Sequence, residues 1–402
     1  MPAAPPEIRA DFSALSAEQH VALAVSGGSD STALMHLVVA WARTNHPGLR
    51  LSVLTVDHSL RAGSAGEALQ VKAWAERLGL VHGTLLWDVT PKPATGLQAR
   101  ARGARYNLMA AWCRAHGAGA LLTAHTLDDQ AETVLMRLAR TASPDSLAGI
   151  RPRGAWNGLP LLRPLLHARR EALRQYLLTL GQDWVEDPSN ADPRFERVRV
   201  RQSLALSGAG VVTRERLAAL ADASARTSAL LERLTRRWIG LWLREEAAGI
   251  CHVPRSAFEG LPAALQERIL ARIITHYGGG GLLPEPQELR RLVHWAASDE
   301  GPMRRTLAGA LIGRRKSGFW VTREASRVDA APLTVPGTGK ALWDGRFLVD
   351  AAPGATVAPA GVRQPGLGPE VPVYAKRAYP WVESPAGAAK PVQIRFLRLA
   401  KA

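Results

Sequence analysis

The sequence predicts an α/β protein with a doubly wound parallel sheet, followed by a mainly helical second domain and a small C-terminal region that contains β-strands. Between residues 21 and 139, short apolar runs alternate with longer amphipathic runs, which is typical of strands that alternate with helices. The first apolar run is followed at once by a glycine- and serine-rich turn. Beyond Arg151 the alternation ends and longer helical periodicities follow.

The runs of the first half assign its elements in order. Strands are predicted over 21–25, 51–56, 81–87 and 120–123, and helices over 97–116 and from Asp30, Ser64 and Asp128 onward. Ser64 and Glu67 have the spacing of a capping box, and Asp128 is expected to cap the helix that it opens. Ligands of such sheets bind beyond the carboxyl ends of the strands, so the loops after the first, second and fourth strands are expected to converge on one crevice.

The second half is predicted to be helical over 169–180, 212–244 and 261–277. A hairpin is expected over 306–322, with a basic tip at 314–318. Residues 330–372 are rich in Pro, Gly and Ala, which is typical either of a linker or of a loop-rich small domain. We divide the chain into three predicted domains, 1–205, 206–300 and 301–402.

Length and charge limit the class of protein. With 402 residues, the chain is longer than one hydrophobic core usually supports. The formal net charge of +16 indicates a polyanionic partner, of which nucleic acid is the leading candidate. The alternative is that a GC-rich genome has produced an arginine-rich chain without selection for binding.

Cysteine usage and hydropathy indicate the cellular compartment of the protein. The two cysteines, Cys113 and Cys251, lie far apart, which argues against a disulfide framework, a zinc ribbon or an iron–sulfur cluster. The chain begins without a signal-like segment and contains no apolar stretch long enough for a membrane span. We therefore expect a cytoplasmic protein without a membrane partner.

The segment Ser26-Gly27-Gly28-Ser29-Asp30-Ser31 is a predicted phosphate site. Two glycines allow the tight turn at which successive N–H groups converge, and the following helix adds the positive end of its dipole. No lysine follows in the Walker A position, so the loop differs from that of P-loop kinases and GTPases. The three serines are expected either to donate to phosphate or to cap the helix. Asp30 either holds Mg²⁺ or supplies a helix N-terminal charge.

Two further loops carry candidate catalytic side chains. His58 follows the second strand, and His125, Asp128 and Asp129 follow the fourth. Adjacent helical residues project about 100° apart, so the two aspartates are expected to have different roles, one as a cap and one facing a cation. Which aspartate has which role stays open, and each histidine is either structural or functional.

The motifs together resemble a known family. The loop at 26–31 is similar to that of the N-type ATP pyrophosphatases, which cleave ATP between its α and β phosphates. The ordered succession of motifs over the first half of the chain resembles the tRNA(Ile)-lysidine synthase family: SGGSDS at 26–31, VDHSLR at 56–61, ARARGARY at 99–106, TAHTLDDQAETVLMRLAR at 123–140, RPLL at 163–166 and WVEDPSN at 184–190.

This resemblance implies an adenine nucleotide alpha hydrolase-like fold and a ligase. Members of the family attach free L-lysine to the wobble cytidine of tRNA(Ile) with a CAU anticodon, using ATP and releasing AMP and pyrophosphate through an adenylated cytidine. The implied cofactors are ATP and Mg²⁺, and the implied partners are that tRNA and lysine, with a homodimer as one option for assembly. Domain 1–205 would be catalytic, 206–300 would contact tRNA, and 301–402 would be a small basic domain.

The resemblance also suggests roles for single residues. Ser26, Gly27, Gly28, Ser29, Asp30, Ser31 and His58 would bind the nucleotide, with Asp30 also binding the metal. Asp30, Arg105, His125, Asp128 and Asp129 would be catalytic. One of the two adjacent aspartates would orient the lysine amine and accept its proton, with Arg105 favouring the neutral amine.

The chain departs from the family pattern at Gln98, Thr126 and Val198, where Glu, His and Asn are expected. These departures support one rival hypothesis, an inactive RNA-binding paralogue. A tRNA thiolase of the same superfamily is disfavoured because it normally needs catalytic cysteines or a cluster site.

Overall fold

The computed structural model describes residues 5, 7–57, 63–87, 97–140, 143–186, 192–206, 212–280, 284–298, 301, 303–363, 365–368, 371–386 and 391–399. The chain divides into two compact units, Met1–Ser228 and Ala229–Ala402. Among the described residues, no helix has the length and apolar character that a membrane crossing needs.

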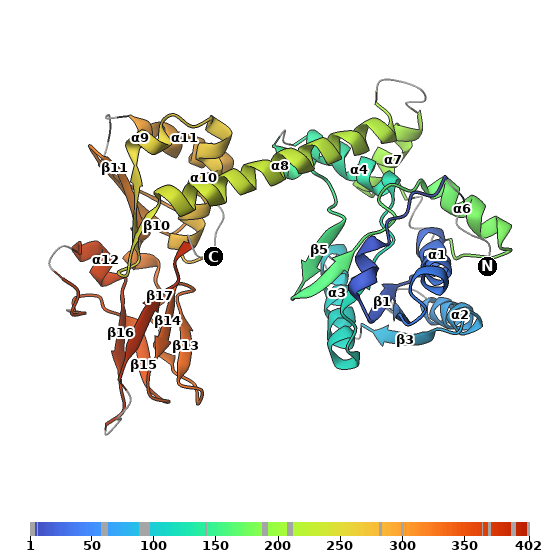
Figure 1. Cartoon of the computed structure of the whole chain (residues 1–402), viewed down its shortest axis with the longest axis horizontal. Coiled ribbons are helices and arrows are strands. Elements are labelled where there is room, and N and C mark those ends of the chain that lie inside the picture. Colours follow the sequence, from blue (N-terminus) through green and yellow to red (C-terminus); the bar gives the residue numbers. More distant parts are fainter. Residues whose placement is uncertain are drawn as a thin grey trace. The chain divides into compact units, whose positions relative to one another are not determined.

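The first unit contains a six-stranded sheet in the order β3-β2-β1-β4-β6-β5 (Figure 1). All neighbouring pairs are parallel except β5 with β6. The strands are β1 (His20–Ala24), β2 (Arg50–Asp57), β3 (Val81–Leu86), β4 (Ala120–Leu122), β5 (Arg153–Trp156) and β6 (Leu159–Leu162). The predicted parallel sheet is therefore confirmed, with one antiparallel strand added at its edge.

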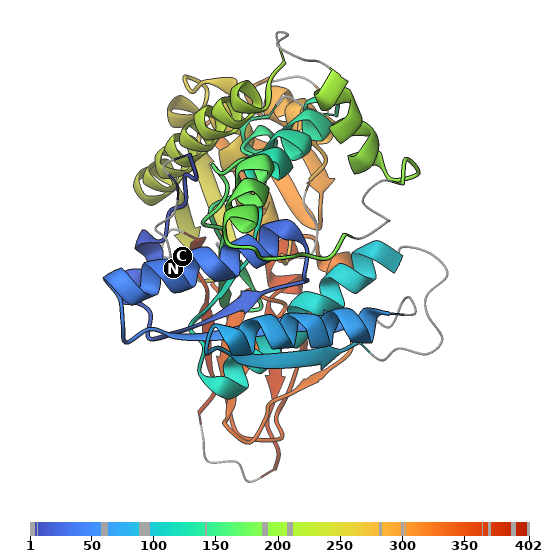
Figure 2. The same cartoon turned by 90° about the vertical axis from the view of Figure 1, so that its right-hand side faces the viewer.

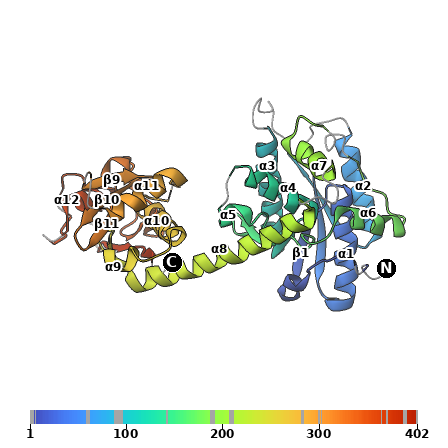
Figure 3. The ribbon, with the colours of Figure 1, turned by 90° about the horizontal axis from the view of Figure 1, so that it is seen from above.

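Helices cover both faces of this sheet. They are α1 (Ser29–Asn45), α2 (Ser64–Arg77), α3 (Leu97–His116), α4 (Leu127–Leu138), α5 (Pro144–Leu147), α6 (Arg170–Thr179) and α7 (Glu196–Leu206), and α8 (Arg214–Trp242) begins in this unit. In Figure 3, α1, α2 and α6 lie on one side of β1 and α3 lies on the other. Figure 2 shows the blue helices α1 and α2 crossing the near face of the unit.

The alternation of β1 explains this layering. Val21 and Leu23 pack in the core that contains side chains of α1, α2 and α6, whereas Ala22 packs in the core formed with α3. All three side chains are fully buried. A strand that is buried on both faces reads as a continuous apolar run, as this one does.

The second unit combines helices with short antiparallel strands. Its elements are β7 (Arg244–Glu246), β8 (Ile250–Pro254), α9 (Arg255–Phe258), α10 (Ala263–Tyr277), α11 (Pro286–Ala297), β9 (Arg304–Leu307), β10 (Ala310–Arg315), β11 (Gly318–Arg323), β12 (Leu333–Thr334), β13 (Lys340–Trp343), β14 (Phe347–Asp350), β15 (Thr356–Pro359), α12 (Val373–Arg377), β16 (Pro380–Glu383) and β17 (Gln393–Phe396). The sheets have the orders β7-β8-β11-β10-β9, β12-β15-β16 and β13-β14-β17.

The second unit differs from the predicted organisation in several details. Strands β7 and β8 were not predicted, and β8 pairs with β11, so residues of the predicted 206–300 and 301–402 segments share one sheet. The residues at 330–372 form strands of the small sheets, which favours a loop-rich domain over a linker. The three-domain division stays a prediction.

Three local expectations were wrong. Gly63, at φ 104°, is the N-cap of α2 in place of Ser64, which is already the first helical residue. Thr126, not Asp128, is the N-cap of α4. The predicted hairpin is present, but Arg314 is buried and donates to the carbonyl oxygens of Trp295 and Gly301, so it does not belong to a basic tip.

Candidate active site

The phosphate loop connects the end of β1 to the start of α1. Gly27 has a left-handed φ of +89°, and an added Cβ would lie 3.1 Å from Val185 Cγ2 and 3.2 Å from Val71 Cγ2. The Val185 amide donates to the Gly27 carbonyl oxygen at 2.9 Å. Glycine is therefore required at this position both by the turn and by the close neighbours.

Hydroxyl groups hold the loop in shape from within. The Ser26 amide donates to Ser31 Oγ at 3.2 Å, and the Ser31 hydroxyl donates to the Gly28 carbonyl oxygen at 3.0 Å. Thr32 Oγ1 donates to the Gly27 carbonyl oxygen at 3.1 Å. Gly28 is the N-cap of the 17-residue helix α1 and has no side chain with which to satisfy the first helical N–H groups. This helix end is therefore a site where backbone donors can bind an anion.

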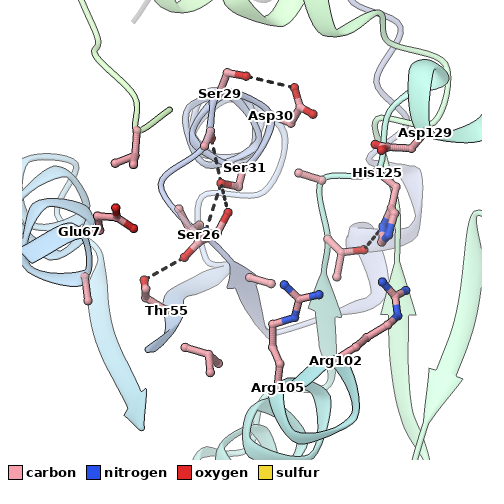
Figure 4. A pocket seen from close by; sticks show the side chains of 18 of the residues that line it. Ser26, Ser29, Asp30, Ser31, Thr55, Glu67, Arg102, Arg105, His125 and Asp129 are labelled. Atoms are coloured by element: carbon pink, nitrogen blue, oxygen red, sulfur yellow. Dashed lines mark hydrogen bonds between the residues drawn. The ribbon is translucent and has the colours of Figure 1, made fainter. Parts of the chain in front are cut away.

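The loop opens on a cavity of about 560 Å³. Figure 4 shows its side chains arriving from the loop, from α3 and from the start of α4. Eight predicted site residues line the cavity: Ser26, Gly28, Ser29, Asp30, Ser31, Arg105, His125 and Asp129. Gly27 and Asp128 are not among the lining residues. His58 lies outside the described residues.

Arg170, the first residue of α6, joins the phosphate loop to α4. Its Nε donates to Asp30 Oδ2 at 2.8 Å, and its Nη2 donates to Asp129 Oδ1 at 3.3 Å. The Arg170 and Asp30 side chains are only 19% and 18% exposed, so solvent screens this pair weakly. Burial would lower the pKa of Arg170, but the carboxylates of Asp30 and Asp129 raise it above its ordinary value, so the guanidinium is permanently charged.

The two aspartates that Arg170 joins respond differently to their surroundings. Burial raises the pKa of Asp30 despite the guanidinium of Arg170, and the nearby Asp129 adds to the effect. Burial alone would raise the pKa of Asp129 too, but Arg170, His125 and the Thr126 amide outweigh it and lower that pKa. Asp129 is therefore the more firmly ionised carboxylate of the pair.

The adjacent aspartates have different contacts, and the predicted division into one cap and one partner of a cation does not describe them, because Asp129 both belongs to the capping box and pairs with Arg170. Asp129 Oδ2 accepts from the Thr126 amide at 2.9 Å, and Thr126 Oγ1 in turn accepts from the Asp129 amide, which forms a capping box. Asp128 accepts from the Arg170 amide at 2.8 Å and pairs with Arg214 Nε at 2.8 Å. Asp129 faces the cavity, whereas Asp128 fastens α4 to α6 and α8.

A third carboxylate, Glu132, lies one helical turn beyond Asp129. Its side chain is 1% exposed, and three arginines surround it. Arg201 Nε lies 2.7 Å from Oε1, Arg197 Nε lies 3.2 Å from Oε2, and Arg170 Nη1 lies 3.9 Å from Oε1. Desolvation makes an unpaired buried carboxylate costly, and these guanidiniums offset the cost of burying Glu132.

His125 is a neutral polar group in the cavity. Its Nδ1 lies 2.9 Å from Thr123 Oγ1. Burial lowers the pKa of His125 to about 4, against which the Asp129 carboxylate acts only in part. The imidazole is therefore uncharged at neutral pH and acts as a hydrogen-bonding group there.

Arg102 and Arg105 reach the cavity from α3. Their guanidinium carbons lie 5.2 and 5.7 Å from the centroid of the Tyr106 ring. Burial lowers the pKa of Arg105 from its ordinary value, although a guanidinium remains charged at neutral pH. Among the described residues, no carboxylate forms an ion pair with either arginine, so both can bind an incoming anion.

The carboxylates of the cavity determine which metal ion could bind there. The described residues contain no cluster of three or more His, Cys, Asp or Glu side chains suited to a metal. Mg²⁺ bound to phosphates usually keeps its waters and takes only one or two protein carboxylates. Asp30, beside the anion-binding helix end, fits that limited role.

Several lining residues were missed by the sequence analysis. Arg170 is the most important of them, with Arg102, Arg174 and Glu186 also in the lining. Glu132, which is not among the lining residues, was also missed, although it follows Asp129 by three positions and so lies on the same helix face. No local pattern predicts Arg170, because its partners are distant in the chain.

The departures from the family pattern have structural counterparts. Thr126 is fully buried and supplies the cap of α4, and Val198 is buried on α7. The side chain of Gln98 lies outside the described residues.

Comparisons with known proteins agree with this site. Residues 6–207 match the family model described as a PP-loop domain. The chain is 40% identical over 347 residues to the tRNA(Ile)-lysidine synthase of Ruegeria pomeroyi, covering 85% of this chain and 79% of that protein. It is 40% identical to the corresponding synthase of a Bradyrhizobium species, covering 77% of this chain and 89% of that protein. The synthase of Brucella ovis is 39% identical, with coverages of 81% and 73%.

Among solved structures, the U34-tRNA thiolase NcsA from Methanococcus maripaludis, with its 4Fe-4S cluster, is 15% identical, with a TM-score of 0.46. That match covers 54% of this chain and 76% of that chain. The sequence matches extend over most of the chain, and the family model covers residues 6–207 of the first unit. On this ground the chain, an ATP-using tRNA modification enzyme with a PP-loop domain, belongs to the tRNA(Ile)-lysidine synthase family.

Proposed function

We propose that this enzyme ligates free L-lysine to the wobble cytidine of tRNA(Ile) with a CAU anticodon, using ATP and releasing AMP and pyrophosphate. The observation that carries the proposal is one cavity that joins an anion-binding loop to the largely buried carboxylate of Asp129. Such a cavity offers a donor set for phosphates beside an acceptor set for an ammonium group. The identity of the tRNA in this proposal is taken from the names of the relatives. The use of ATP and lysine is supported by the geometry of the cavity.

The triphosphate is expected at the N-terminus of α1. Backbone N–H groups of the phosphate loop would donate to the phosphate oxygens, with the helix dipole favouring the negative charge. Asp30 would hold Mg²⁺, which when bound would supply positive charge to the leaving pyrophosphate. Arg105 and Arg102 would neutralise charge that develops during adenylation.

The first chemical step would adenylate the cytidine. Its 2-carbonyl oxygen attacks the α-phosphorus, the bond to the bridging oxygen breaks, and pyrophosphate leaves. His125, being neutral, can donate or accept a hydrogen bond there without changing its charge. The product carries a good leaving group on carbon 2 of the base.

The second step would transfer lysine. The ε-nitrogen forms a bond to carbon 2, the bond from that carbon to the adenylate oxygen breaks, and AMP leaves with the oxygen. A free lysine amine has a pKa of about 10.4 and enters mainly as ammonium. Asp129, which is ionised because its pKa is lowered, would orient the ammonium and accept the proton that the amine releases.

The remaining roles concern the macromolecular partner. Arg197 and Arg201 of α7 line the cavity and add positive charge there, which favours an anticodon loop with splayed bases. We propose a cytoplasmic location because the substrate tRNA functions there.

The decisive experiment is ATP-dependent incorporation of labelled lysine into unmodified tRNA(Ile) with a CAU anticodon. The elongator tRNA(Met), which has the same anticodon, is the matched control. We expect lysidine, identified by mass after nuclease digestion, in the isoleucine tRNA alone. Tight tRNA binding with no incorporation would instead support an inactive paralogue.

A further inference from the structure

Arg170 contacts both halves of the cavity. Toward the phosphate loop it donates to Asp30, and toward α4 it donates to Asp129 and approaches Glu132. A guanidinium presents several N–H donors in a rigid fork, so it can hold two carboxylates at once. The side chain is 19% exposed, which keeps these interactions in a poorly screened environment.

The position of Arg170 conflicts with lysine binding at Asp129. An ammonium group that pairs with Asp129 adds a second positive charge beside the guanidinium. Like charges a few ångströms apart repel strongly where solvent is scarce. Lysine must therefore either displace Arg170 from Asp129 or bind beside it despite the repulsion between the guanidinium and the ammonium group.

Bound phosphates would change that balance. The guanidinium already lies at Asp30, next to the loop where a triphosphate would bind. Arginine binds phosphate through the same fork with which it binds carboxylate. A triphosphate at the loop would attract Arg170 away from Asp129 and would leave that carboxylate to the substrate ammonium.

We propose that Arg170 is a positioning residue that couples the two substrate sites: it pairs with the Asp129 carboxylate in the empty enzyme and yields it to lysine when nucleotide phosphates bind. This inference rests on the proposed function, because it assumes that lysine binds at Asp129. Because coupling free energies are reciprocal, bound lysine would tighten nucleotide binding by the same factor.

The backbone of Arg170 separates this role from a purely structural one. Its amide donates to Asp128 at 2.8 Å, and this bond keeps α6 against α4 whatever the side chain is. Arg169, the preceding residue, is 59% exposed and pairs with Glu215 away from the cavity. Arg169→Gln therefore removes the same charge from the same helix end and serves as the matched control.

The test measures the dissociation constant of L-lysine by calorimetry, with and without saturating α,β-methylene ATP, on the full chain. For the unaltered enzyme and for Arg169→Gln, we expect the analogue to tighten lysine binding about fivefold or more. For Arg170→Gln, lysine should bind tightly without the analogue, and the analogue should change its affinity by less than twofold.

Arg170→Lys is the second variant, for the case in which Arg170→Gln does not fold. It keeps the charge but cannot hold two carboxylates through separate nitrogens, so we expect competition with lysine to remain and the effect of the analogue to decrease. The proposal is overturned if Arg170→Gln binds lysine more weakly than the unaltered enzyme, or if the analogue tightens lysine binding equally in all variants.

Lysidine formation by the unaltered enzyme is measured first, since its absence would refute the proposed function and not the role of Arg170. Given that activity, a lowered kcat with an unchanged or lower KM for lysine in Arg170→Gln would agree with the coupling. A raised KM with unchanged kcat would contradict it.

Discussion

Arg170 Nε donates to Asp30 Oδ2 at 2.8 Å, although 140 positions separate the two residues in the chain. The bond links the first helix of the sheet domain to a helix that follows the last strand of the same sheet. Both residues lie at the carboxyl ends of the parallel strands, where doubly wound sheets bind their ligands. The charge balance of the site is therefore set by tertiary structure and not by the phosphate-loop motif alone.

Asp30→Asn tests the role of this carboxylate in nucleotide chemistry. The substitution keeps the shape of the side chain but removes its charge, so we expect a loss of about 100-fold or more in ATP–pyrophosphate exchange. Binding of tRNA(Ile), measured by filter retention, should change less than twofold. Asp11→Asn is the control, since Asp11 bonds to Ser13 in the N-terminal segment. Equal exchange rates in both variants would remove Asp30 from the mechanism.

The roles of the adjacent aspartates can be distinguished with the variants Asp129→Asn and Asp128→Asn. Asp129 lines the cavity, so its variant should raise the KM for lysine about tenfold with little change in the KM for ATP. Asp128 instead pairs with Arg214 and the Arg170 amide, so its variant should lower the free energy of unfolding by about 1–3 kcal/mol. Urea unfolding and steady-state kinetics together distinguish the two. The assignment is reversed if Asp128→Asn has the larger effect on the lysine KM.

The lowered pKa of His125 predicts that the unaltered enzyme loses stability relative to a His125→Asn variant as the pH falls. Its folded-state pKa of about 4 lies below the unfolded value of about 6.5, so the unfolded chain takes up a proton that the folded chain does not. Its contribution is present above pH 6.5 and is lost as pH falls toward 4, by about 3 kcal/mol in all. The comparison is with His125→Asn, because other buried histidines respond in the same direction. Urea midpoints from pH 7 to pH 5 should fall more steeply for the unaltered enzyme.

Gly27→Ala tests the geometry of the phosphate loop. A left-handed φ and contacts at 3.1 and 3.2 Å oppose a methyl group, so we expect a loss of about 1–3 kcal/mol in stability and weaker ATP binding. Gly66→Ala in α2, where nothing lies within 4 Å of the added Cβ, should instead be stabilising by about 0.5–1 kcal/mol. Thermal unfolding of both variants measures the contrast. A stable Gly27→Ala enzyme with normal ATP affinity would contradict the requirement for glycine.

The sequence predicts most of what depends on neighbouring residues. Strand β1, the phosphate loop and helix α1 follow one another without interruption, so the local pattern contains both the fold and the anion site. The capping of α4 was misassigned because Asp128 and Thr126 are both good N-cap residues, and only the pairing of Thr126 with Asp129 decides between them.

Groups that come together only through tertiary structure were not predicted. Arg170 acquires its role from Asp30 and Asp129, which lie far away in the chain. Strands β7 and β8 are short, and β8 is stabilised by pairing with β11 some 70 residues later. The periodicity of a short sequence segment contains no information about contact partners that lie far away in the chain.

The double burial of β1 has a consequence for how the enzyme can vary. Every side chain from Val21 to Leu23 is enclosed by one core or the other, and the phosphate loop begins three residues after the last of them. Inserting or deleting one residue in the strand would exchange the side chains of the two cores and shift the loop by about 3.3 Å. Changes at the surface and in the second unit can therefore arise without moving the phosphate loop. A change in the length of β1, by contrast, also alters the active site.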